Sequence, residues 1–93
     1  MRKKFLIFIF ASFFLTSLNA NNNLKNVIVN GNERVSDETI KIYGDIEVNK
    51  KIDDKKINNI LRNLYETNFF EDIKIKFENN VLEINVVEFP VIN

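Results

Sequence analysis

The stretch LYETNFFEDI at residues 64–73 decides the fold that the sequence predicts. The residues leading into it have the i, i+3, i+4, i+7, i+8 apolar spacing of one helical face, at Ile57, Ile60, Leu61, Leu64 and Tyr65. After it, apolar residues alternate with lysines over residues 73–77, which is typical of a half-buried strand. A short turn joins the two, and we expect its adjacent Phe69 and Phe70 to pack in the core and the turn rather than to form an exposed pair.

Two shorter stretches upstream predict another strand and another helix. Residues 27–29 are a β-branched run that predicts a strand, and Gly31 after it can adopt the positive φ of a tight turn. Ser36 is a good N-cap for a helix of about two turns. We expect that helix to stop at Gly44.

A hairpin completes the predicted domain. The asparagine pair at residues 79–80 tolerates positive φ and predicts a two-residue turn between the strand at 73–77 and a second alternating strand at 82–87. Pro90 ends this strand because proline cannot donate to the ladder. The predicted order is β-α-α-β-β, an α+β fold in which two helices cover one face of a three-stranded sheet and the other face is polar.

The beginning of the chain has the layout of a secretory signal peptide. Basic residues at 2–4 precede an uncharged apolar run at 5–18, and we expect cleavage between Ala20 and Asn21. A membrane-spanning helix needs roughly 20 apolar residues, so an anchor that stays in place is the less favoured alternative. The expected organisation is a signal peptide at 1–20, a polar leader at 21–23, a folded domain at 24–89 and the start of a linker at 90–93.

Composition excludes several classes of function. The 93 residues include 13 basic and 13 acidic ones, but three of the basic residues lie in the signal, which leaves a mature part with a net charge of −3. Nothing in this balance indicates nucleic acid. The absence of histidine and cysteine removes the commonest general base, the commonest metal ligand and any disulfide, and argues against a small secreted hydrolase. The sequence predicts no enzyme, no cofactor and no metal site.

The paired acids of the chain have an ordinary explanation. A catalytic acid pair needs burial or a like-charge clash to shift a pKa, and both pairs are expected at exposed ends of elements. Either Asp53 or Asp54 is expected to cap the helix that follows, and Glu71 and Asp72 are expected to be solvated. Ser36 has no base that could activate it as a nucleophile.

The strand at residues 73–77 is the candidate binding site. Should it lie at the edge of the sheet, its unpaired N–H and C=O groups could take an extra strand from a client protein. The residues of this candidate edge are Ile73, Lys74, Ile75, Lys76 and Phe77. The two lysines could contact an acidic partner, but edge strands also carry lysine to discourage aggregation, which is the favoured explanation.

An apolar tail follows the last predicted strand. It comprises Phe89, Pro90, Val91 and Ile92 and has no place in the predicted core. We expect these residues to lead into a following domain, with an ordinary frayed terminus as the alternative.

Several motifs, in this order along the chain, resemble a POTRA domain, a polypeptide-transport-associated repeat. They span residues 24–92 and are VIVNGNERVS (27–36), ETI (38–40), LYET (64–67), FFEDI (69–73) and VVEFP (86–90). The likeness is greatest to the first such repeat of an outer-membrane protein assembly factor, although Asn68 stands where the family usually has glycine. The resemblance implies a mixed sheet with the last strand in the middle, which leaves residues 73–77 on an edge. It also implies a structural role for Gly31, Asn32 and Arg34 at the corner after the first strand.

The resemblance further implies partners and a location. Such a repeat stands in the periplasm, in a string of repeats ahead of a transmembrane β-barrel, in a machine that receives and inserts unfolded outer-membrane proteins. This chain would then bind unfolded outer-membrane proteins or accessory assembly subunits at the periplasmic face of the outer membrane. It would meet the membrane only through the barrel of a longer parent chain. A cell-division protein, a two-partner secretion protein and a stand-alone periplasmic binding domain remain the alternatives.

Overall fold

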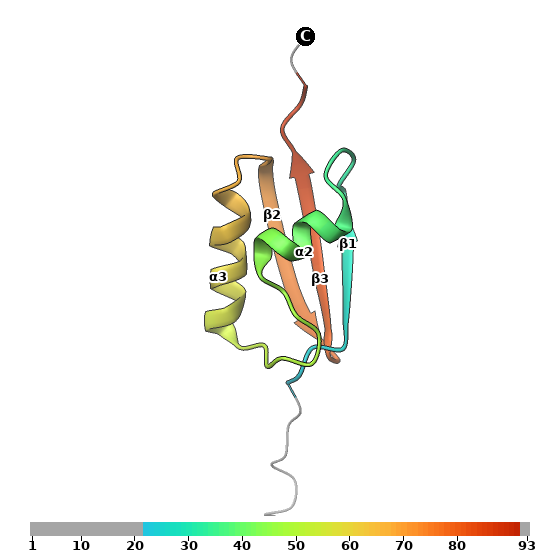
Figure 1. Cartoon of the computed structure of the whole chain (residues 1–93), viewed down its shortest axis with the longest axis vertical. Helices are drawn as coiled ribbons and strands as arrows, with labels where there is room; N and C mark the ends of the chain where they lie inside the picture. Colours follow the sequence, from blue (N-terminus) through green and yellow to red (C-terminus); the bar gives the residue numbers. More distant parts are fainter. Residues whose placement is uncertain (1–21, 92–93) are drawn as a thin grey trace, which may run out of the picture.

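The order of elements predicted from the sequence is confirmed by the computed structural model, which describes residues 22–91. In chain order it contains β1 (Asn26–Asn30), α2 (Asp37–Gly44), α3 (Asp54–Tyr65), β2 (Phe70–Glu78) and β3 (Val81–Glu88) (Figure 1). The expected signal peptide at residues 1–20, its cleavage point between Ala20 and Asn21, and Ile92 of the apolar tail lie outside the described residues.

The three strands form one mixed sheet with β3 in the middle and β1 and β2 on the two edges. β1 runs parallel to β3, with Val27 opposite Leu82, and β2 runs antiparallel to β3, with Ile75 opposite Ile84. Both helices lie on the same face of the sheet, with α2 across it and α3 alongside β2 (Figure 1). The expected α+β arrangement is therefore confirmed, including the β1-β3-β2 order of the strands.

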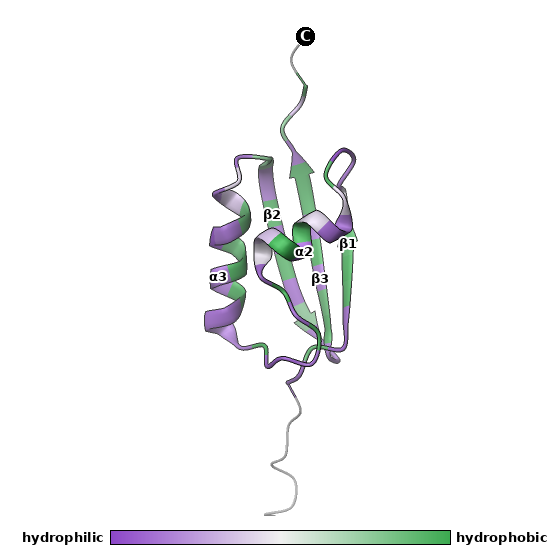
Figure 2. Cartoon of the chain, viewed as in Figure 1, coloured by the Kyte–Doolittle hydropathy of each residue, from purple (hydrophilic) through white to green (hydrophobic). Residues whose placement is uncertain are grey.

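The core lies between the helices and the covered face of the sheet. Figure 2 shows the apolar side of α3 turned toward β2 and its hydrophilic side turned away. The buried apolar residues come from every element except β1, from the residues before β1 and from the segment between α2 and α3: Leu24, Ile40, Ile46, Ile52, Ile60, Leu64, Phe70, Ile73, Leu82, Ile84 and Val86. Half-buried Val27 and Val29 of β1 pack against this set. The alternation read from the sequence therefore marks the covered face correctly.

Side-chain caps fix where the two helices begin. Ser36 accepts the N–H of Thr39 at 3.1 Å, and Asp53 accepts the N–H of Lys56 at 2.8 Å. Of the two candidate acids, Asp53 is thus the N-cap and Asp54 is the first helical residue. Each cap satisfies one of the N–H groups that the first helical turn leaves without a backbone partner.

The end of α2 differs in mechanism from the expectation for Gly44. The helix does stop there, but the left-handed residue is Asp45, with φ of 57°. Gly44 is the last helical residue and is buried, and a Cβ atom built on it would lie 3.0 Å from Ile46 Cδ1 and 3.3 Å from Ile60 Cγ2. Close packing of α2 on Ile46 and Ile60 therefore favours a small residue here, and no positive φ is involved.

β2 begins three residues earlier than expected. Its pairing with β3 shifts register between Phe70 and Asp72, and such an irregularity interrupts the two-residue alternation on which a sequence prediction relies. Phe70 is buried, whereas Phe69 is 39% exposed and makes edge-on ring contacts with Tyr43 and Phe70. One phenylalanine therefore belongs to the core and the other packs in the turn.

The residues before β1 belong to the fold. The main chain of Leu24 is held on both sides, because its N–H donates to Lys50 O at 2.8 Å and its C=O accepts from Asn49 N–H at 2.7 Å. Ile52 N–H donates to Asn22 O at 2.9 Å. This small antiparallel pairing connects the start of the described chain to the segment between α2 and α3, and it places the fully buried Leu24 in the core.

Candidate strand-binding edge of the sheet

The register of the hairpin determines which groups of β2 face away from the sheet. Asn79 and Asn80 have φ of 53° and 65°, as a two-residue turn requires, and Glu78 stands opposite Val81. The pair that flanks such a turn is hydrogen-bonded, and bonded and non-bonded pairs alternate along an antiparallel ladder. The N–H and C=O groups of Ile73, Ile75 and Phe77 therefore point to the open edge.

The candidate edge combines outward main-chain groups with side chains that turn inward. Ile73 is buried, and Ile75 and Phe77 are half-buried and pack against the core. Lys74 and Lys76 lie on the uncovered face of the sheet and are exposed, because side chains alternate with the same period. The structure thus places all five predicted residues on one edge strand and divides them into an apolar row and a basic row.

Ion pairing engages only one of the two lysines in the described part of the chain. Lys76 Nζ lies 3.5 Å from Glu78 Oε1, and both side chains are largely exposed, so this pair stabilises the fold little. Elsewhere on the uncovered face, Asn30 donates to Asn85 Oδ1 at 3.1 Å. The face is polar as expected, apart from Ile28 and Val87, and the lysines are compatible with either of the roles considered above.

One outward donor of β2 is already occupied by the chain itself. Tyr65, the last residue of α3, accepts the N–H of Ile73 on its hydroxyl at 3.1 Å. The same hydroxyl lies 3.5 Å from Asp72 Oδ1, to which it donates. Tyr65 was expected only as part of the apolar stripe of its helix. A tyrosine hydroxyl usually needs a polar partner, and this is the one sign in the sequence that Tyr65 makes a hydrogen bond. It does not show that the partner is Ile73.

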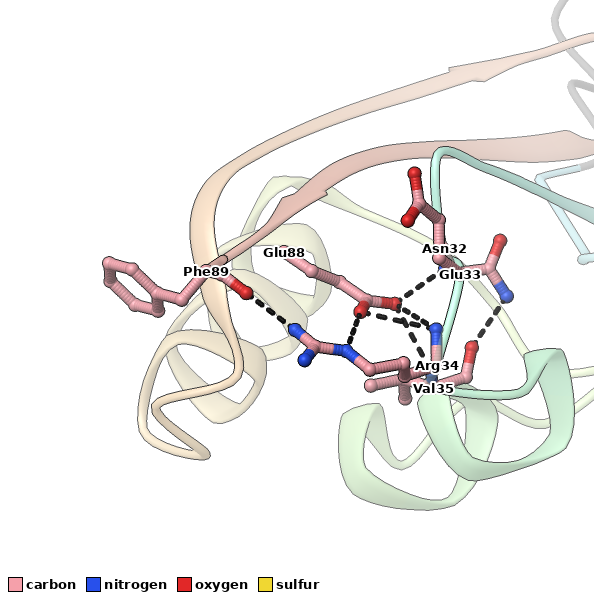
Figure 3. A network of polar contacts seen from close by, with 6 residues as sticks. All are labelled: Asn32, Glu33, Arg34, Val35, Glu88 and Phe89. Carbon is pink, nitrogen blue, oxygen red and sulfur yellow. Dashed lines mark hydrogen bonds and ion pairs between the residues drawn. The ribbon is translucent and has the colours of Figure 1, made fainter. Parts of the chain in front are cut away.

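A second polar centre lies at the corner between β1 and α2 (Figure 3). The Glu88 carboxylate accepts the main-chain N–H of Glu33 at 2.6 Å, of Arg34 at 3.0 Å and of Val35 at 3.1 Å. Arg34 Nε donates to the same carboxylate at 3.2 Å, and the guanidinium also donates to the C=O of Phe89. The carboxylate therefore ties the end of β3 to the loop before α2.

Burial and hydrogen bonding act in opposite directions on the Glu88 carboxylate. Its side chain is only 7% exposed, against 51% for Arg34, and burial by itself raises the pKa of Glu88. The main-chain N–H groups of Val35 and Glu33, together with both donors of Arg34, stabilise the charged form and outweigh burial. The pKa of Glu88 consequently lies below its ordinary value, and the carboxylate stays charged in the folded protein at neutral pH.

The three residues that the resemblance marks as structural meet at this corner. Gly31 has φ of 90°, and a Cβ built on it would lie 2.1 Å from Val86 O, so no other residue fits there without displacing β3. Asn32 donates to Val35 O at 2.7 Å and to Asp37 Oδ1 at 2.8 Å. Arg34 makes the contacts to Glu88 already described. These geometries hold the loop between β1 and α2 and leave none of the three pointing to a reactive centre.

The apolar tail emerges beside this corner. Phe89 donates its N–H to Phe69 O at 3.0 Å, which continues the hairpin by one residue, while its side chain is 46% exposed. Pro90 and Val91 are exposed. Hollows of about 490 and 520 Å³ flank the Arg34–Glu88 pair, and Phe89 and Pro90 line both. The predicted interdomain residues that the structure describes therefore lie together on the surface at one end of the sheet.

The paired acids of the sequence either cap a helix, accept from a tyrosine or face solvent in residues 22–91. Within that range no three acidic side chains come together as a metal site would require. Asp53 caps α3, Asp72 accepts from Tyr65, and Glu71 is exposed. Neither α2 nor α3 has the length and apolar character that a bilayer crossing demands.

Comparison of the chain with protein-family models and with curated proteins finds no match. The geometry of the β2 edge is therefore the main ground for a functional argument.

Proposed function

We propose that this chain is an exported protein-binding module that captures extended segments of other polypeptides by adding them as a strand to β2. The observation that carries the proposal is the outward main chain of Ile75 and Phe77 at the edge of the sheet. Main-chain hydrogen bonds give such a site affinity for many sequences, because every client offers the same N–H and C=O groups.

The other edge of the sheet is less suited to this role. β1 has five residues against nine in β2. Since alternate residues of β3 bond to each neighbour, Val27 and Val29 face outward on β1. The N–H of Val27 is taken by the side chain of Asn26 at 3.0 Å. A client strand therefore finds fewer open donors on β1 than on β2.

The biological setting of the proposal comes from the sequence. The signal-like leader supports export, and the motifs in POTRA-like order support a periplasmic repeat of an outer-membrane protein assembly machine. The clients in this setting are unfolded outer-membrane proteins, with accessory assembly subunits as further partners. Strands of such clients alternate apolar and polar residues, which suits an edge with an apolar row on one side and Lys74 and Lys76 on the other.

The test uses a peptide and two proline variants of the purified protein. The probe is an acetylated, amidated peptide of alternating valine and glutamate, whose glutamates would face Lys74 and Lys76. Ile75→Pro removes an outward donor and should weaken binding by roughly 3- to 10-fold, the usual net contribution of one hydrogen bond. Val29→Pro is the matched control, because it removes an outward donor from a half-buried β-branched residue on the opposite edge.

Amide hydrogen exchange gives the direct measurement. Peptide binding should slow exchange at Ile75 and Phe77, while circular dichroism confirms that both variants are folded. Equal peptide affinity of the folded Ile75→Pro variant and the parent protein, with no slowing at the two amides, would show that clients do not add to β2.

A further inference from the structure

The outward donors along β2 are not equivalent. Three residues direct N–H groups to the open edge at intervals of two, and only the first, Ile73, has a partner among the described residues. That partner is the Tyr65 hydroxyl at 3.1 Å, at the point where α3 ends and turns into β2. Tyr65 is 40% exposed, so its ring stands beside the edge rather than inside the core.

The regular ladder also changes at this end of the strand. Between Phe70 and Asp72 the pairing of β2 with β3 shifts register, and the Asp72 carboxylate accepts from the Tyr65 hydroxyl at 3.5 Å. An incoming strand that reached Ile73 would have to displace the hydroxyl from both groups. It would then continue into a segment whose donors and acceptors no longer alternate regularly.

At its other end the edge is limited by the hairpin turn. Asn79 and Asn80 have positive φ, and the chain reverses there into β3. The stretch of β2 with open outward donors and regular pairing therefore extends only from Ile75 to Phe77. A strand placed antiparallel on it can form a complete pair of hydrogen bonds at each of these two residues.

We propose that Tyr65 is the register-determining residue of the β2 edge: its hydroxyl occupies the N–H of Ile73 and stops an added strand at Ile75. This inference rests on the proposed function. The client segment that binds is then short and pairs with β2 at Ile75 and Phe77. Its apolar side chains lie on the side of the helices, and its acidic or polar side chains lie on the side of Lys74 and Lys76. A longer client segment gains nothing from residues beyond the stop.

A series of peptides of increasing length tests the stop. The probes are alternating valine–glutamate peptides of roughly 3 to 10 residues, the range of ordinary strands. Affinity for the native protein should rise with length and then level off. Tyr65→Phe keeps the ring but frees the N–H of Ile73. The affinity for this variant should therefore keep rising until the peptide is about two residues longer, since outward groups recur every second residue. The longest peptide should bind this variant about 3- to 10-fold more tightly than it binds the native protein.

Tyr43→Phe is the matched control. It removes a hydroxyl from the exposed tyrosine on α2, whose ring contacts Phe69 instead of β2, and it should leave the length dependence unchanged. The native protein supplies an independent readout in which no variant has to fold. Adding the longest peptide should slow exchange at Ile75 and Phe77 but leave the amide resonance of Ile73 in place.

The two hypotheses fail in different ways. The peptide affinity could level off at the same length in Tyr65→Phe and in the native protein, while amide exchange at Ile75 and Phe77 slows in both. That result would overturn the stop at Tyr65 but would leave strand addition to β2 supported. A large shift of the Ile73 resonance in the native protein has the same meaning, because it shows the hydroxyl displaced. Absence of any slowing at Ile75 and Phe77 overturns strand addition and the stop together.

Discussion

At the scale of single residues, the Glu88 carboxylate is the charged group with the most hydrogen bonds in the described range. One carboxylate accepts three main-chain N–H groups and the Arg34 side chain, and it is almost fully shielded from solvent. Glutamine keeps one acceptor oxygen but puts an NH₂ group in place of the other, so part of these donors lose their partner and the rest lose a charged one, at a cost of about 1–3 kcal/mol. We expect Glu88→Gln to lower the free energy of unfolding by that amount in urea denaturation, and the exposed Glu71→Gln to have almost no effect.

The same carboxylate should make stability depend on pH. The pKa of Glu88 is lowered in the folded state from its ordinary value of 4.5, because the hydrogen bonds outweigh the effect of burial. The unfolded chain therefore binds the proton first as pH falls. The contribution of the Glu88 carboxylate to stability is complete above pH 4.5 and is lost as the pH falls through the lower pKa of the folded state. The stability difference between the parent and Glu88→Gln should shrink across that window. A difference that stays constant in acid would contradict this account.

The two glycines offer a second comparison at this scale. Alanine at position 31 would need a positive φ and would place its Cβ 2.1 Å from Val86 O, so β3 must move. Alanine at position 44 would lie 3.0 to 3.3 Å from side-chain atoms of Ile46 and Ile60, which would have to shift slightly, and it would gain helix propensity of about 1 kcal/mol. We expect Gly31→Ala to cost roughly 1–3 kcal/mol or more and Gly44→Ala to cost clearly less, as measured by thermal unfolding. Equal losses would mean that the loop before α2 adapts freely.

At the scale of elements, α3 depends on a single cap. Asp53 accepts the N–H of Lys56, whereas Asp54 contributes only negative charge to the first turn. Asp53→Ala should therefore cost about 1 kcal/mol and Asp54→Ala no more than a few tenths, since a lost cap leaves a donor unsatisfied and a lost dipole interaction does not. Denaturant unfolding of the two neighbouring variants measures the difference. A larger loss of stability in Asp54→Ala than in Asp53→Ala would show that Asp53 is not the residue that caps α3.

The elements also show what the sequence could predict. The stripe of α3 and the alternation of the hairpin follow from periodicity, because each repeats over enough residues to distinguish a helix from a strand. The first residue of β2 could not be predicted from periodicity, since the register shift between Phe70 and Asp72 breaks the alternation. The left-handed Asp45 was missed for another reason: the adjacent glycine is the usual signal for that conformation, and here it serves packing.

At the scale of the whole molecule, long-range polar contacts were beyond the reach of sequence patterns. Glu88 lies 53 to 55 positions from the N–H groups that it accepts. Tyr65 reaches Ile73 only because α3 lies alongside the β2 edge. The position of β2 at an edge of the sheet was predicted correctly, but the bond between its Ile73 N–H and the Tyr65 hydroxyl was not. That bond depends on the packing of a helix beside a strand.

The contacts around Phe89 have a mechanical consequence. Its N–H is held by Phe69 O and its C=O by the Arg34 guanidinium, so the peptide groups on both sides of this residue are clamped to different parts of the domain. Pro90 follows, and its ring restricts rotation about its own N–Cα bond. The path of the chain is thus held as far as the peptide bond between Phe89 and Pro90, which shortens the segment about which anything joined behind it could swing.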